Sequence, residues 1–168
     1  LVRAARQDQH LAAVVLHIDS GGGSALASDL IWRELKLLDQ EKPLIIYMSN
    51  TAASGGYYIA TPGREIIAQS ATITGSIGVV IAKPVTKATR AKIGANREVL
   101  KRGDNASLYT DDDLWTSTQR QKVEEQLFSV YHTFKQRVAE GRGLPFDALD
   151  EIANGRVWTG KQALAHGL

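Results

Sequence analysis

The sequence contains no cysteine among its 168 residues, and this absence removes several kinds of chemistry at once. Disulfide bonds, zinc–thiolate sites and a cysteine nucleophile are all excluded. No apolar run approaches the roughly 20 residues that a membrane-spanning helix needs. An excess of one charge is also missing, because 20 Lys and Arg residues face 18 Asp and Glu residues, for a net charge of +2. Nucleic-acid binding usually shows a clustered basic face, so we expect no nucleic-acid partner.

The composition is that of a folded domain. Hydrophobic residues make up 43% of the chain and charged residues 23%, which is enough apolar surface for a packed core. We expect residues 1–168 to form a single domain, since this length is typical of one. The chain begins at Leu1 and stops at Leu168, just after an expected helix end, so we also expect it to be a fragment of a longer polypeptide.

Short apolar runs that end in small residues alternate with helical patterns along the chain. A continuous apolar run ended by glycines is typical of a buried parallel strand. Strands that alternate with helices predict an α/β fold with a largely parallel sheet. After an opening helix, the expected strands cover residues 12–18, 43–48, 65–68 and 73–81, with 97–100 as a further candidate, and the expected helices cover residues 25–39, 57–61, 117–140, 146–153 and 160–166.

The first expected strand ends in three glycines, Gly21–Gly23. Glycines at such a turn let backbone N–H groups approach a ligand closely, and the start of the following helix adds partial positive charge. The turn is therefore either an anion or oxyanion site, or simply a tight strand-to-helix connection. It is not a phosphate-binding P-loop, because the Gly-Lys-Ser/Thr ending is absent.

Ser54 lies between the second expected strand and a helix start. This placement resembles a nucleophile elbow, although the Gly-x-Ser-x-Gly pattern of hydrolases is absent. The alternative is a serine that only caps the helix. Because the carboxyl ends of parallel strands share one edge of a sheet, Gly22 and Gly23 could place N–H donors near Ser54. That pairing favours a nucleophile.

A serine nucleophile needs a base, and the histidines do not offer an obvious one. All four lie on strand-like or helix-like segments away from the glycine clusters, so we expect structural roles for His10, His17, His132 and His166. Asp111–Asp113 form an acidic turn that we expect to be solvated or to begin a helix, rather than to bind a metal. We predict no metal site and no cofactor.

Taken together, four motifs resemble the signal peptide peptidase A family, also called protease IV, of the S49 serine peptidases. Their order and spacing cover nearly the whole chain, which makes the set more specific than any one motif. The motifs are Asp19-Ser20-Gly21-Gly22-Gly23-Ser24, Ala52-Ala53-Ser54-Gly55-Gly56-Tyr57-Tyr58, Thr74-Gly75-Ser76-Ile77-Gly78-Val79 and Gly155-Arg156-Val157-Trp158-Thr159-Gly160.

The resemblance implies a ClpP/crotonase-like fold of repeated strand–strand–helix units and a Ser–Lys dyad. It makes Ser54 the nucleophile and Ser76 the residue that orients the base lysine. It places the oxyanion hole at the N–H of Gly55 with an N–H from the turn that holds Gly22 and Gly23. A lysine acts as a base only if burial lowers its pKa from about 10.4 toward neutrality.

The sequence departs from the family pattern at two places. The usual Ser-Pro-Gly-Gly turn reads Ser20-Gly21-Gly22-Gly23, and Ala106 stands where single-domain members carry the catalytic lysine. In tandem members the amino-terminal half supplies the lysine and the carboxy-terminal half the serine. We therefore expect this chain to be such a carboxy-terminal half, with the base supplied from outside it. Lys101 is the nearest substitute within the chain.

The resemblance further implies a serine endopeptidase that degrades cleaved signal peptides and other apolar peptides. It implies a homo-oligomer on the outer face of the cytoplasmic membrane, anchored through a part outside this chain, and we expect the isolated fragment to be inactive. One alternative is a catalytically degenerate repeat that serves assembly. Another is a crotonase-like acyl-CoA enzyme, in which Ser54 would have no role. A ClpP-like Ser-His-Asp peptidase is disfavoured because no histidine lies near Val79.

Overall fold

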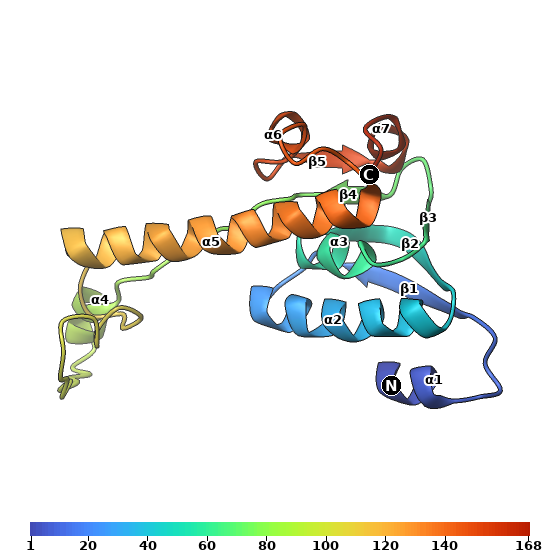
Figure 1. Ribbon diagram of the computed structural model, residues 1–168. Coiled ribbons are helices and arrows are strands. Elements are labelled where there is room, and N and C mark those ends of the chain that lie inside the picture. The colour runs from blue at the N-terminus through green and yellow to red at the C-terminus, as the bar shows by residue number, and fades with distance from the viewer. The chain divides into compact units, whose positions relative to one another are not determined.

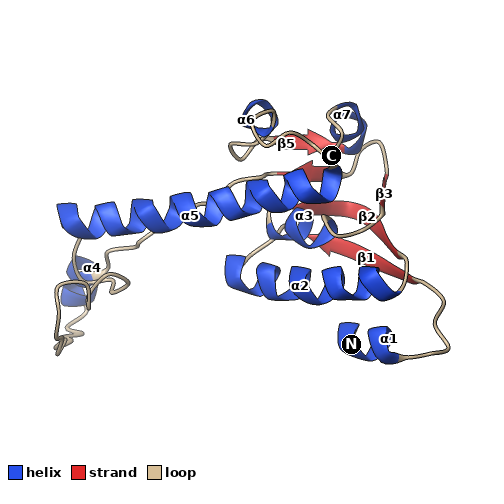
Figure 2. Cartoon of the chain, in the orientation of Figure 1, coloured by secondary structure: helices blue, strands red, loops and turns tan.

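The computed structural model describes all of residues 1–168 and contains one five-stranded sheet with helices (Figures 1 and 2). The chain divides into two compact units. Unit 1 consists of Leu1–Val79 and Val130–Leu168, and unit 2 of Val80–Ser129. The expectation of a single peptidase-like domain stays a prediction. The whole sheet and all the glycine-rich strand ends lie in unit 1.

The secondary-structure elements follow the expected alternation. None of the helices combines the length and the apolarity that crossing a membrane requires. In chain order the elements are α1 (Val2–Gln7), β1 (Val14–Ser20), α2 (Ala25–Glu41), β2 (Leu44–Ala53), α3 (Gly55–Ala60), β3 (Glu65–Ala68), β4 (Ile73–Gly75), α4 (Lys87–Lys92), α5 (Ser117–Arg142), α6 (Leu149–Ile152), β5 (Val157–Thr159) and α7 (Gly160–Ala165).

The sheet is largely parallel, which confirms the predicted α/β fold class. Its order is β1-β2-β4-β5, and β3 pairs with β2 as well. The strands β1, β3 and β4 all run parallel to β2, whereas β5 runs antiparallel to β4. The sequence did not predict β5, because its three residues are too few to show a periodicity.

Strand β2 was expected to end at Met48 but continues to Ala53. An irregularity in its pairing with β1 accompanies this extension. The β1–β2 pairing shifts register between Ile18 and Ser20. At the shift the Asp19 carboxylate accepts hydrogen bonds from the Asn50 side chain at 2.9 Å and from the Thr51 N–H at 3.1 Å. The polar end of β2 is therefore bonded into the sheet without any apolar alternation that the sequence could show.

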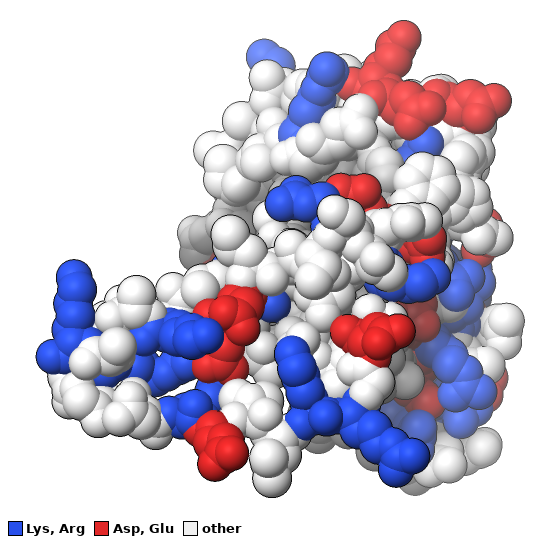
Figure 3. Space-filling model, turned by 90° about the vertical axis from the view of Figure 1, so that its left-hand side faces the viewer, with Lys and Arg blue, Asp and Glu red and all other residues white.

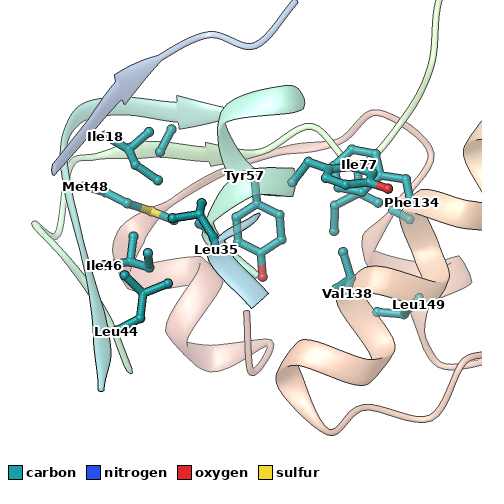
Figure 4. Packing of buried hydrophobic residues seen from close by; sticks show 14 of the residues in the cluster. Ile18, Leu35, Leu44, Ile46, Met48, Tyr57, Ile77, Phe134, Val138 and Leu149 are labelled. Atoms are coloured by element: carbon teal, nitrogen blue, oxygen red, sulfur yellow. The ribbon is translucent and has the colours of Figure 1, made fainter. Parts of the chain in front are cut away.

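The hydrophobic core lies where α2, α3 and the second half of α5 pack against one face of the sheet (Figure 4). Residues at alternate positions of β2 point into it, as do residues at helical spacing on α2. Its fully buried members include Leu35, Leu38, Leu44, Ile46, Met48, Tyr57, Val138 and Leu149. Burial of a side chain of this size contributes about 1.5–3 kcal/mol to folding.

The opposite face of the sheet is open. Val15 on β1 is 67% exposed and Ile67 on β3 is 51% exposed, and His17 on β1 is exposed too. The prediction that the first strand is buried is therefore wrong for this face. The reason is that β1 is an edge strand, paired only with β2, and the helices of unit 1 cover one face alone.

Between residues 73 and 100 the structure differs from the sequence-based prediction at three places. The strand expected over 73–81 ends at Gly75, because the chain turns there: Gly75 and the next residue, Ser76, both have positive φ angles. No strand forms over 97–100, where Leu100 is 91% exposed. The short helix α4 was not expected.

Two arginines form ion pairs with the acidic turn of unit 2. Arg90 and Arg97 each form ion pairs with both Asp111 and Asp112. A hydrogen bond from the Thr86 hydroxyl, followed by one from Arg97, holds the pKa of Asp111 below its usual value. The sequence predicted a solvated turn or a helix start here. The carboxylates of Asp111 and Asp112 instead form ion pairs that link separate segments of unit 2. On the face drawn in Figure 3, basic and acidic side chains are interspersed.

Candidate active site

Three parallel strands end at one edge of the sheet, and the candidate site is built from the residues directly after those strands. The register pairs Ser20 of β1 with Ala52 of β2, and Ala53 of β2 with Gly75 of β4. The glycine turn, Ser54 and Ser76 each come directly after these positions. Neighbouring parallel strands thus bring together the chain segments that the sequence singled out.

Ser54 occupies a strained turn between β2 and α3. Its φ of 53° and ψ of −121° are rare for a residue with a side chain and cost about 1–3 kcal/mol. Two backbone hydrogen bonds hold it there: its N–H donates to the Gly75 carbonyl at 2.9 Å, and its carbonyl accepts from the Tyr58 N–H at 2.8 Å. The turn has the mechanical features of a nucleophile elbow.

The hydroxyl of Ser54 is not used as a helix cap. Ser54 stands at the N-cap position of α3, yet its side chain makes no capping hydrogen bond. Ser24, at the same position of α2, does accept a bond from the Ala27 N–H at 3.3 Å. The contrast weighs against the view of Ser54 as a simple cap and leaves its half-buried hydroxyl available for other chemistry.

At Gly22 the glycine turn lies so close to Ser54 and Gly55 that a side chain there would not fit. A Cβ on Gly22 would lie 2.6 Å from the Gly55 nitrogen and 2.9 Å from Ser54 Cβ. Gly22 also has a φ of 100°, which strongly favours glycine. A Cβ on Gly55 would in turn lie 3.2 Å from the Gly23 nitrogen. The two backbones therefore run against each other beside the serine.

Two backbone N–H groups are the candidate donors of an oxyanion hole. Gly55 is the first residue of α3, so its N–H has no acceptor within the helix. In the glycine turn, the Gly22 N–H already donates to Ser20 Oγ at 3.2 Å. The candidate donor of that turn is therefore the N–H of the next residue, Gly23. Both groups lie at the start of a helix, where partial positive charge favours a developing anion.

Ser76 is held by the fourth motif. Its N–H donates to the Arg156 carbonyl at 2.7 Å, and the Gly155 N–H donates to the Ile77 carbonyl at 2.9 Å. Gly75 before it packs on Trp158, since a Cβ there would lie 2.7 Å from the indole Cδ1. The antiparallel strand β5 thus supports the turn that carries Ser76.

No hydrogen bond in the structure joins a lysine to Ser54 or Ser76. In unit 1, Lys42 Nζ donates to the Ala5 carbonyl at 2.9 Å, and Lys135 pairs with Asp150. In unit 2, Lys101 Nζ lies 3.5 Å from Ser107 Oγ.

The histidines and acidic residues have other contacts. His17 Nε2 lies 2.9 Å from Ser49 Oγ on the open sheet face, and the rings of His132 and His166 pack on Phe146 and Trp158. No group of three or more His, Asp or Glu side chains converges in a way that could hold a metal ion.

Two serines that support the site were not singled out from the sequence. Ser20 Oγ accepts the hydrogen bond from the Gly22 N–H and thereby orders the glycine turn. Ser28 Oγ donates to the Ser24 carbonyl at 3.0 Å and is buried against Gly55, where an added Cβ would lie 2.5 Å from it. The spacing of four residues between Ser24 and Ser28 on one helix face was the available signal.

A cavity of about 340 Å³ lies in unit 1 between β2, β3 and α7. It is lined mostly by apolar side chains, among them Met48, Ile67 and Leu164. Ser54, Ser76 and the glycine turn are not among its lining residues. The candidate site therefore lies outside this cavity.

A strained serine at a strand-to-helix turn, beside paired backbone N–H groups on a parallel sheet, is typical of serine hydrolases. Comparison with known proteins gives the particular family. Residues 36–168 match the family described as "Peptidase family S49", and the chain belongs to it. The resemblance seen in the sequence motifs is thereby confirmed, together with a ClpP-like fold and a place among the serine peptidases.

Several curated proteins resemble the chain over nearly its full length. "Serine protease SPPA, chloroplastic" of Arabidopsis thaliana is 43% identical over 99% of this chain and 25% of that protein. "Protease 4" of Haemophilus influenzae is 36% identical over 100% of this chain and 27% of that protein. "Putative signal peptide peptidase SppA" of Enterococcus faecium is 32% identical over 97% of this chain and 48% of that protein. The chain thus spans about a quarter to a half of the length of these relatives.

Proposed function

We propose that this chain carries the nucleophile of a serine endopeptidase, with Ser54 Oγ as the attacking atom. The observation that carries the proposal is the strained Ser54 turn, whose hydroxyl caps no helix and whose backbone lies against Gly22. The relatives named as proteases support the reaction class.

In the proposed reaction, Ser54 Oγ forms a bond to the scissile carbonyl carbon and gives its proton to the base. The carbonyl oxygen takes up negative charge and accepts hydrogen bonds from the N–H groups of Gly23 and Gly55. The C–N bond then breaks, the base returns its proton to the departing amine, and water hydrolyses the acyl-enzyme. Loss of one oxyanion donor typically slows such a reaction by about 100- to 1000-fold.

We propose that the base is a lysine from outside these 168 residues, so that the catalytic pair is a Ser–Lys dyad. Ala106 replaces the lysine of single-domain family members, and no lysine of the chain is hydrogen-bonded to Ser54. A neutral lysine amine can accept the serine proton only where burial disfavours its charged form. Ser76 would hydrogen-bond to this amine and orient it, and the isolated chain would be inactive.

The proposed substrates are extended apolar peptides such as cleaved signal peptides. Leu26 and Leu30, on the first two turns of α2 after the glycine turn, are 71% and 57% exposed. An apolar surface next to the site suits an apolar chain. We further propose a homo-oligomer at the outer face of the cytoplasmic membrane, attached through a part of the protein outside this chain. The name of the Enterococcus faecium relative supports the substrate class.

The second candidate is a degenerate repeat that serves assembly, and the alanine at position 106 is the observation that favours it. A crotonase-like acyl-CoA enzyme is the weaker alternative, because the strained turn would then present a hydroxyl with no role. Both predict that the serine at position 54 is dispensable.

Hydrolysis of a fluorogenic apolar peptide by the full-length protein tests the proposal. We expect Ser54→Ala to abolish turnover and Ser49→Ala, a serine on the open sheet face, to retain it. Ser76→Ala should lower kcat. Turnover that survives Ser54→Ala would refute the nucleophile. Strong hydrolysis by the isolated chain, retained in Lys101→Ala, would refute a base supplied from outside.

A further inference from the structure

A partly buried hydrogen bond joins the two helices that begin at the candidate site. The Tyr58 hydroxyl on α3 donates to Asp29 Oδ1 on α2 at 2.6 Å. Tyr58 is 4% exposed, and its ring packs on Phe134 with 4.8 Å between the ring centres. Burial, and then the hydrogen bond to Asp29, raise the pKa of Tyr58 above its ordinary value. The hydroxyl therefore keeps its proton and remains a donor.

Each of these helices carries one half of the proposed oxyanion hole at its start. Helix α3 begins with Gly55, and the Tyr58 N–H donates to the Ser54 carbonyl, so Tyr58 is one turn away from the nucleophile. Helix α2 comes directly after the turn that holds Gly23, and Asp29 lies on its second turn. A change in the distance between the helices would therefore change the distance between the two N–H donors.

The helices meet at a second point nearer to the site. Ser28 on α2 is 7% exposed and packs against Gly55, the first residue of α3. The two contacts involve consecutive residues of α2, Ser28 and Asp29, and residues of α3 about one turn apart, Gly55 and Tyr58, so together they constrain how α3 lies on α2. The hydrogen bond between Tyr58 and Asp29 is the second, outer contact.

Further side chains hold Asp29 in place. Arg137 Nε on α5 lies 3.6 Å from Asp29 Oδ1. The Arg137 guanidinium in turn stacks on Trp32, with 3.8 Å from Cζ to the ring centre. A cation over an aromatic ring is stabilised by the negative face of the ring. The acceptor of the Tyr58 bond is thus itself oriented by α5.

We propose that Tyr58 and Asp29 are positioning residues for peptide hydrolysis, holding the N–H groups of Gly23 and Gly55 at the spacing that the oxyanion requires. This inference rests on the proposed function. Neither side chain touches the reacting atoms. Donors that are displaced by a fraction of an ångström still bind a ground-state carbonyl but stabilise the oxyanion less, so the effect belongs in kcat rather than in KM.

The test is steady-state hydrolysis of an apolar peptide by the full-length protein, well below the unfolding temperature of each variant. Tyr58→Phe should lower kcat by about 10- to 100-fold, because misplacement by about 1 Å costs on the order of 100-fold. KM should change by less than about twofold. Asp29→Leu should match it, and the double variant should be no slower than either single variant. Asp29→Asn keeps an acceptor oxygen and should largely restore kcat.

The matched control is the neighbouring tyrosine. Tyr57 on the same helix is buried as well, but its hydroxyl has no hydrogen-bond partner, so Tyr57→Phe should leave kcat unchanged. Wild-type kcat in Tyr58→Phe, or a change confined to KM, would overturn the inference while the Ser54 dependence of turnover still upheld the proposed function. Turnover that does not depend on Ser54 would overturn both.

Discussion

At the scale of single residues, the glycine turn and the serine turn meet closely at Gly22, where a Cβ would lie 2.6 Å from the Gly55 nitrogen. We expect Gly22→Ala to destabilise the fold by about 1–3 kcal/mol, because alanine is strained at a φ of 100°. The methyl group would also displace Gly55, so hydrolysis should fall at least about 100-fold.

Gly21→Ala is the matched control for this substitution. A Cβ at Gly21 would meet no atom within 4 Å. Thermal unfolding and kcat measured on both variants separate the positions. Equal effects at Gly21 and Gly22 would contradict the close approach that defines the candidate oxyanion hole.

The lowered pKa of Asp19 leads to a prediction of how the stability of the protein depends on pH. Hydrogen bonds from Asn50 and then from the Thr51 N–H lower the pKa of Asp19. A carboxylate whose folded pKa is depressed contributes stability above its unfolded pKa, about 3.9, and loses it as pH falls through the folded value. From about pH 5 to about pH 2, the unfolding temperature of the wild type should therefore fall more steeply than that of Asp19→Asn. Parallel curves would contradict this.

The sequence predicted which segments meet at the edge of the sheet, but not the side-chain contacts between them. The glycine clusters and Ser54 stand out because small residues end apolar runs, and the structure places them at one edge of the sheet. The bond between Tyr58 and Asp29 could not be predicted in the same way, because it depends on how α2 and α3 cross. That crossing results from tertiary packing and leaves no local pattern.

At the scale of secondary-structure elements, two serines at helix starts behave differently. Ser24 caps α2, so Ser24→Ala should lower the free energy of unfolding by about 1 kcal/mol. Ser54 makes no cap bond to α3, so Ser54→Ala should change it by less than about 0.5 kcal/mol. Denaturant unfolding of both variants measures the difference. If Ser54→Ala lowered the free energy of unfolding as much as Ser24→Ala, Ser54 would have to be regarded as a helix cap.

Elements were predictable where burial gives them a period. The helical spacing of α2 was apparent because one face of it contacts the core, whereas β1 was predicted from a continuous apolar run and is buried on one face only. The end of β2 and all of β5 were not, since polar or very short segments are held there by hydrogen bonds to Asp19 and to β4. The false strand over 97–100 has apolar residues but no partner strand.

At the scale of the whole molecule, the serine and its proposed oxyanion donors lie within unit 1, while Ala106, which the motif resemblance matches to the family's lysine, lies in unit 2. We therefore propose that this chain supplies the nucleophile and both oxyanion donors, and that the base comes from outside it. Val15 and Ile67 on the sheet are also largely exposed.

The most direct measurement is peptide mapping by mass spectrometry after the full-length protein reacts with a serine-directed phosphonate probe. The account predicts a single adduct on Ser54, none in Ser54→Ala, and labelling of the isolated chain at least about 100-fold slower because the base is missing. Labelling at another serine, or no labelling of an intact and folded full-length protein, would contradict the central claim that Ser54 is the activated nucleophile.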